Sequence, residues 1–202
     1  MYQWRTLSEP ERAGLLAHRQ RAGRPWHSPP HWNREGPARF HLTAACYEHA
    51  AHIGHTAERM DAFADELLAT CATPLAQIIA WCVLPNHYHL LLETPDLRAL
   101  TTAIGRLHGR TSRAWNLAER TTGRYVFSRA ADRAIRSDAH FWATLNYVHH
   151  NPVRHGYVTR WTDWPWSSAN DYLRSIGREE ATRLWQRHPL LDYGAGWDDP
   201  DL

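Results

Sequence analysis

The sequence lacks lysine altogether, although 23 of its 202 residues are basic, so arginine supplies every strongly basic side chain. Arginine makes forked, paired hydrogen bonds to phosphate and stacks on nucleobases, whereas lysine acts as a compact point charge. The net charge is only +2, because 21 acidic residues offset most of the arginines. The overall charge therefore does not by itself indicate nucleic-acid binding, which has to be argued from where the arginines lie.

Cysteine and long apolar runs are also scarce. The three cysteines are far apart and odd in number, and no Cys-x-x-Cys pair occurs, so we expect neither a disulfide framework nor a zinc–thiolate site. The N-terminus has no apolar signal-peptide core, and the longest apolar run, residues 75–84, is too short to cross a bilayer. We therefore expect a soluble cytoplasmic protein with no membrane partner.

Hydrophobic periodicity predicts strands and helices in a mixed order. Strands are expected at 39–47, 75–83, 87–93 and within 125–135, and helices at 56–68, 94–120 and from Ser137 or Asp138 to about Pro152. The resulting order is strand, helix, strand, strand, helix, strand, helix. It predicts an α+β fold with a ferredoxin-like antiparallel sheet and helices on one face.

Composition suggests extensions at both ends of this unit. Residues 24–30 are rich in proline and read as an extended linker, so residues 1–36 are predicted to be an N-terminal extension. The compact domain is predicted to cover 37–160. Residues 161–202 form a predicted C-terminal tail that ends in acidic residues.

Two histidines, His87 and His89, stand two residues apart on the strand predicted after a turn at 84–86. Side chains at i and i+2 share one face of a strand, so the two imidazoles converge while Tyr88 points away. Neutral imidazole binds divalent metals. A His-x-His pair alone is a weak signal, because it is often just a polar pair on a sheet surface, and Mg²⁺ or Mn²⁺ would require further oxygen ligands.

The last predicted helix carries Tyr147 and Asn151 on one face, because they are four residues apart. A tyrosine here could offer a nucleophilic hydroxyl, and the asparagine a further ligand. A tyrosine on an amphipathic helix is, however, usually a core residue, and asparagine before proline usually ends a helix. The residues alone leave both interpretations open.

Arginine is concentrated between these two motifs. Residues 98–136 contain nine arginines and only two acidic residues, and three of the arginines recur at i, i+4 and i+7 on one predicted helix. Such runs usually form a solvated helix face. Their position between the two motifs favours contact with phosphate instead. The predicted DNA contacts are Arg106, Arg110, Arg113 and Arg124.

Five segments resemble a known family. Residues 83–91 resemble the metal-binding strand of the HUH single-tyrosine transposases, and residues 147–156 resemble their nucleophile helix in the form typical of REP-associated tyrosine transposases. Segments 109–116, 123–127 and 164–168 also resemble that family, so the likeness spans about residues 38–173. Tyr88 departs from the aliphatic residue usual between the histidines, but it points away from the predicted metal.

This resemblance implies a function and a set of roles. Tyr147 would attack a phosphodiester of single-stranded bacterial DNA containing REP-like hairpins, leaving a 5′-phosphotyrosine and a free 3′-hydroxyl. His87, His89 and Asn151 would hold Mg²⁺ or Mn²⁺. The alternatives are a domesticated, non-cleaving hairpin-binding protein and a metal-dependent hydrolase that uses water. The related proteins include monomers and homodimers, so the oligomeric state stays open.

Overall fold

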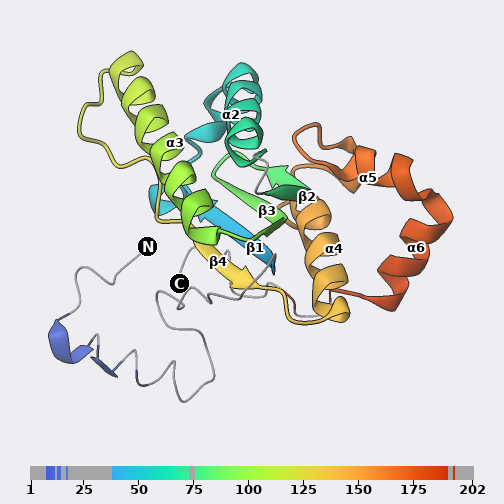
Figure 1. Ribbon diagram of the computed structural model, residues 1–202. Helices are drawn as coiled ribbons and strands as arrows, with labels where there is room; N and C mark the ends of the chain where they lie inside the picture. Colours follow the sequence, from blue (N-terminus) through green and yellow to red (C-terminus); the bar gives the residue numbers. More distant parts are fainter. Residues whose placement is uncertain are drawn as a thin grey trace.

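The computed structural model describes residues 8–11, 13–14, 17, 38–72, 76–190 and 193, so most of the predicted N-terminal extension lies outside the described residues (Figure 1). The central unit follows the predicted order of elements. It consists of β1 (Ala38–Ala45), α2 (Ala57–Cys71), β2 (Gln77–Val83), β3 (His87–Thr94), α3 (Leu97–Ala118), β4 (Ala131–Ala134) and α4 (Asp138–Arg154). Two short 3-10 turns, η2 (Tyr47–His49) and η3 (Ile53–His55), connect β1 to α2.

The four strands form one sheet in the order β2-β3-β1-β4, and every neighbouring pair is antiparallel. This confirms the predicted α+β fold with an antiparallel sheet. In the pairing of β1 with β3, Ala45 lies opposite His87 and Thr43 lies opposite His89. The start of β3 therefore meets the end of β1, next to the connection that leads into α2.

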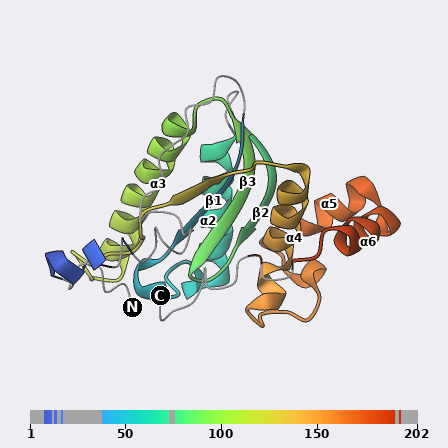
Figure 2. The same ribbon diagram turned by 90° about the horizontal axis from the view of Figure 1, so that it is seen from below.

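Helices cover both faces of the sheet, rather than one face as predicted. Tyr88 of β3 packs against Phe63 of α2 and His108 of α3, which places these two helices on one face. The neighbouring residue His89 contacts Tyr147 of α4, so α4 covers the opposite face (Figures 1 and 2). As a result β1 is buried on both faces and not only on one.

Side-chain caps fix the starts of the three long helices. Thr56 Oγ1 accepts a hydrogen bond from Arg59 N at α2, Asp96 Oδ1 from Ala99 N at α3, and Ser137 Oγ from His140 N at α4. Of the two caps considered for α4, the structure uses Ser137. The helix extends to Arg154, slightly beyond the predicted end at Pro152, because a proline in the last turn removes only one backbone hydrogen bond.

The C-terminal region contains η4 (Trp161–Asp163), α5 (Ala169–Ile176) and α6 (Arg178–Arg187). Its segment 164–168 runs along β2: Val83 N donates to Trp166 O at 2.8 Å, and Ser168 N donates to Trp81 O at 3.0 Å. Trp164 Nε1 also donates to Val83 O at 2.9 Å. This part of the predicted tail is thus joined to the strand that leads into His87, while the boundary at 160 stays a prediction.

The described helices include none with the length and apolar character needed to cross a bilayer.

Candidate active site

Both predicted metal-binding histidines point from β3 toward α4. His87 is 3% exposed and His89 is 1% exposed, and their ring centroids lie 4.9 Å apart. A pair of imidazoles at a sheet surface would be solvated. These two are instead enclosed between the sheet and α4, where burial of polar rings requires polar partners.

Helix α4 brings Asn151 and Tyr147 to the same place. Asn151 Oδ1 lies 3.1 Å from His87 Nε2, and the Tyr147 ring lies 5.1 Å from the His89 ring. One helical turn separates the two residues, so each faces one of the histidines. The structure therefore gathers His87, His89, Asn151 and Tyr147, all predicted from the sequence, into one cluster.

Tyr147 is completely buried. Its ring lies 5.8 Å from that of His41 and 5.6 Å from that of Tyr193, and the Arg154 guanidinium carbon lies 5.7 Å from its centroid. The hydroxyl of Tyr193 is hydrogen-bonded to Thr144 on α4, and burial raises the pKa of Tyr193. A phosphate can therefore reach Tyr147 only when neighbouring side chains move.

Two residues that the sequence analysis did not assign also belong to the cluster. Asn86 Oδ1 lies 2.8 Å from His87 Nδ1, and His41 Nε2 lies 3.2 Å from His89 Nδ1. Each histidine thus has a polar partner at Nδ1, an arrangement that orients metal-bound histidines in many proteins. In the sequence, His41 is marked only by sharing one face of its strand with Thr43. Its link to His89 requires the pairing of β1 with β3, in which Thr43 lies opposite His89.

The donor atoms suit Mg²⁺ or Mn²⁺. Bonds of about 2.1 Å at right angles place neighbouring ligand atoms about 3 Å apart, and His87 Nε2 and Asn151 Oδ1 are 3.1 Å apart. Asn151 Nδ2 is buried and makes no hydrogen bond to the described residues. The amide oxygen, which lies beside His87 Nε2, is therefore the Asn151 atom that has a polar partner. Within the described ranges, no group of three His, Cys, Asp or Glu side chains that could hold a metal ion is found.

The predicted arginine stripe lies elsewhere. Arg106, Arg110 and Arg113 are exposed on α3, which covers the sheet face opposite to α4, the helix that carries Tyr147 (Figure 1). Arg110 forms an exposed ion pair with Glu66 at 3.2 Å. The structure does not bring these arginines to the cluster, so any contact with DNA would involve a different surface.

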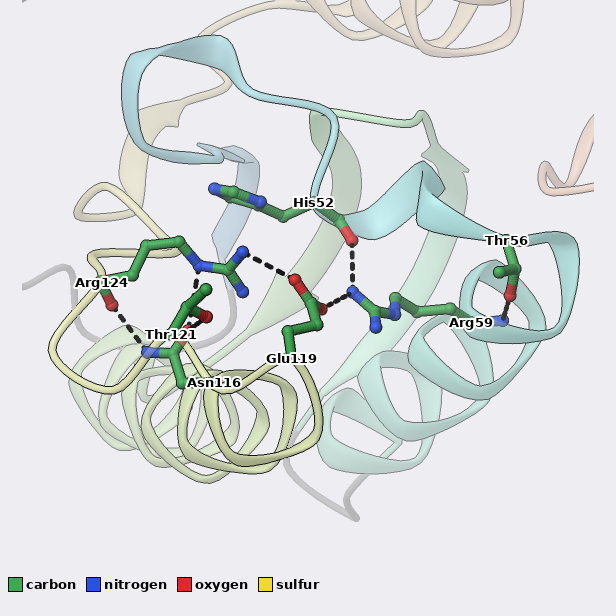
Figure 3. Close-up of polar contacts among 7 residues, drawn as sticks. All are labelled: His52, Thr56, Arg59, Asn116, Glu119, Thr121 and Arg124. Carbon is green, nitrogen blue, oxygen red and sulfur yellow. Dashed lines mark hydrogen bonds and ion pairs between the residues drawn. The ribbon is translucent and has the colours of Figure 1, made fainter.

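Arg124 is engaged within the protein. Its guanidinium donates to Glu119 at 2.7 Å and to Asn116 at 3.0 Å, and Glu119 also accepts from Arg59 at 2.6 Å (Figure 3). The hydrogen bond from Arg124, followed by that from Arg59, lowers the pKa of Glu119 to about 2. The remaining Arg124 nitrogen, Nη2, is buried without a hydrogen-bond partner among the described residues. This geometry serves the fold and disfavours a phosphate contact from Arg124.

Comparisons with known proteins agree with this fold. No protein-family model matches the chain. A Haemophilus influenzae protein provisionally named a REP-associated tyrosine transposase is 31% identical over 133 residues, which cover 60% of this chain and 73% of that protein. The REP-associated tyrosine transposase of Escherichia coli K12 is 27% identical over 132 residues, which cover 59% and 68%.

A solved structure has a similar fold. It is a REP-associated tyrosine transposase bound to a REP hairpin, with a TM-score of 0.59 and 20% identity over 76% of this chain and 89% of that one. By its similarity to the Haemophilus protein, the chain belongs to the REP-associated tyrosine transposases.

Proposed function

We propose that this protein cleaves and rejoins single-stranded DNA containing REP-like hairpins, with Tyr147 as nucleophile and Mg²⁺ or Mn²⁺ as cofactor. The observation that carries the proposal is the cluster of Tyr147 with His87, His89 and Asn151 between the sheet and α4. The family supports a DNA substrate, and one structural relative is bound to a REP hairpin.

The proposed reaction is a phosphoryl transfer in which atoms and charge balance. The Tyr147 oxygen forms a bond to phosphorus, the bond from phosphorus to the 3′ oxygen breaks, and the phenolic proton leaves. The products are a 5′-phosphotyrosine and a 3′-hydroxyl that has gained a proton. The reverse attack by a 3′-hydroxyl rejoins strands without ATP, because the covalent link keeps the phosphodiester bond energy.

The remaining residues bind and orient. His87, His89 and Asn151 would hold the metal, which when bound polarises the phosphate and offsets charge on its oxygens. Helix α4 holds Tyr147 one turn from Asn151, so the nucleophile and a ligand are positioned by the same rigid element. Arg154, also on α4 and 5.7 Å from the Tyr147 ring, can stabilise negative charge on the incoming phosphate.

The test uses Tyr147→Phe, which removes the hydroxyl and keeps the ring packing. Wild-type protein, Mn²⁺ and a labelled hairpin-containing single strand should give a covalent band on a denaturing gel, and Tyr147→Phe should give none while still binding the DNA in a mobility-shift assay. Tyr172→Phe is the matched control. Its buried hydroxyl has no hydrogen-bond partner among the described residues, so the covalent band should persist.

The same gel separates the two alternatives. A non-cleaving hairpin-binding protein would shift the DNA but give no covalent band even as wild type. If the protein is a hydrolase that uses water, its Tyr147→Phe variant would still cleave the DNA. Either result would contradict the proposal.

A further inference from the structure

Asn86 lies in the turn between β2 and β3, directly before His87. Its side chain makes two contacts in opposite directions. Asn86 Oδ1 lies 2.8 Å from His87 Nδ1, and Asn86 Nδ2 donates to the backbone oxygen of His49 at 3.2 Å. The residue thus bridges the β1–α2 connection and one of the predicted metal ligands.

The connection holds this turn firmly. Cys46 N donates to Asn86 O at 2.6 Å, and Gly54 N donates to Pro85 O at 2.8 Å. A Cβ on Gly54 would lie only 2.7 Å from Pro85 Cα, so the two backbones touch and no larger residue fits. His49 and its neighbour Glu48 both have φ of 54°, which is unusual for residues other than glycine. The His49 carbonyl is therefore a fixed acceptor.

The His49 carbonyl determines which way the Asn86 amide faces. A carbonyl oxygen can only accept, so the NH₂ group of Asn86 must point to His49 and the amide oxygen to His87. The amide oxygen is also an acceptor only. His87 Nδ1 must therefore carry a hydrogen, and a neutral ring protonated at Nδ1 has its lone pair on Nε2.

This lone pair faces another acceptor. His87 Nε2 lies 3.1 Å from Asn151 Oδ1, the oxygen of the predicted third ligand. With Nε2 unprotonated, both atoms offer electron pairs, and a cation beside them would use the pairs that ligation requires.

We propose that Asn86 is a positioning residue that fixes the Nδ1–H tautomer of His87, so that the Nε2 lone pair is directed toward the metal. The anchor is the His49 carbonyl, reached through the Asn86 amide. The tautomer itself is independent of the proposed reaction, and its use for metal binding rests on the proposed function.

The first test reads the tautomer without metal or substrate. Long-range ¹H–¹⁵N correlation spectra at about pH 8.5, where an ordinary imidazole is neutral, should show wild-type His87 protonated at Nδ1. Asn86→Ala should move His87 toward the Nε2–H form. Asn86→Asp should keep the Nδ1–H form, because a carboxylate is still an acceptor. Asn170→Ala removes an asparagine that also donates to a backbone carbonyl, and it should change nothing at His87.

The second test measures Mn²⁺ binding by the electron paramagnetic resonance signal of the free ion. Loss of an outer partner of a ligand typically weakens metal affinity about 10- to 100-fold, so Asn86→Ala should bind Mn²⁺ at least about tenfold more weakly, and Asn86→Asp should recover most of this loss. Equal affinity in wild type and Asn86→Ala would overturn the role in metal binding.

Failure of this inference can be told apart from failure of the proposed function. Wild-type His87 protonated at Nε2, or an unchanged tautomer in Asn86→Ala, would overturn the inference even if the protein cleaves DNA. A wild type that binds no Mn²⁺ would contradict the metal-dependent reaction, while the spectra would still decide the tautomer. If Asn86→Ala does not fold, wild type and Asn86→Asp give the tautomer result.

Discussion

Asn151 precedes a proline, a position that in most chains marks the end of a helix. In this protein α4 continues to Arg154, which keeps Asn151 within the helix and turns its side chain toward the sheet. The residue is fully buried, and its amide nitrogen has no hydrogen-bond partner among the described residues. Burial of an amide nitrogen without a hydrogen-bond partner is costly.

Substitutions at Asn151 should separate a ligand role from a packing role. Asn151→Asp keeps an oxygen in place and adds charge, so Mn²⁺ affinity should equal or exceed that of wild type. Asn151→Leu fills a similar volume without an oxygen. Its Mn²⁺ affinity should fall by at least about tenfold, because loss of a ligand should weaken binding at least as much as loss of a residue that only orients a ligand. Titration calorimetry measures both. Wild-type affinity in Asn151→Leu would show that Asn151 is not a ligand.

Periodicity was enough to predict that His87 and His89 share a face, and that Tyr147 and Asn151 share another. It could not identify His41 or Asn86. His41 reaches His89 only because of the register between β1 and β3, and Asn86 depends on a backbone carbonyl of a connection with unusual φ angles. Both are long-range properties that the spacing of residues in one segment does not contain.

At the scale of elements, the order of strands and helices was predicted correctly, but the face covered by α4 was not. A local pattern shows which residues of a helix are apolar without showing which surface they cover. β1 illustrates the limit: its alternation suggested one buried face, while Phe40, His41 and Leu42 are all at most 3% exposed. The second buried face exists because α4 packs there, and this helix lies nearly a hundred residues later in the chain.

The ion pairs of Glu119 link three elements, since this residue caps the end of α3 and binds Arg59 of α2 and Arg124 of the following loop (Figure 3). Glu119→Gln would leave two partly buried guanidinium groups without their shared carboxylate. We expect it to lower the free energy of unfolding at pH 7 by about 1–3 kcal/mol. Urea denaturation measures this. Glu66→Gln, in an exposed pair with Arg110, should cost less than about 1 kcal/mol.

The effect of Glu119 should depend on pH in one direction. Its pKa falls from an ordinary 4.5 to about 2 in the folded protein, because Arg124 and Arg59 bind the charged form. The stabilisation is therefore complete above pH 4.5 and disappears as the pH falls toward 2. The difference between wild type and Glu119→Gln should narrow over this range. A difference that stays constant from neutral pH down to the acid limit of folding would contradict the assignment.

For the whole molecule, α3, which carries the arginine stripe, and α4, which carries Tyr147 and Asn151, lie on opposite sides of the sheet (Figure 2). A nucleic acid that touches both must pass around an edge of the sheet, which a flexible single strand next to a hairpin can do more easily than a straight duplex. Contact with the stripe would then anchor the DNA at a distance from Tyr147. It would add affinity without contributing to the chemical step.

Replacing Arg106, Arg110 and Arg113 by alanine tests this anchoring. Each lost phosphate contact lowers the slope of log affinity against log salt by about 0.7 for a single strand, so three lost contacts should lower it by about 2. The covalent band at saturating DNA should stay at the wild-type level. A control with alanine at Arg174, Arg178 and Arg183 makes the same change in charge on α5 and α6. If the two triple variants have equal salt slopes, general charge and not the stripe on α3 accounts for binding.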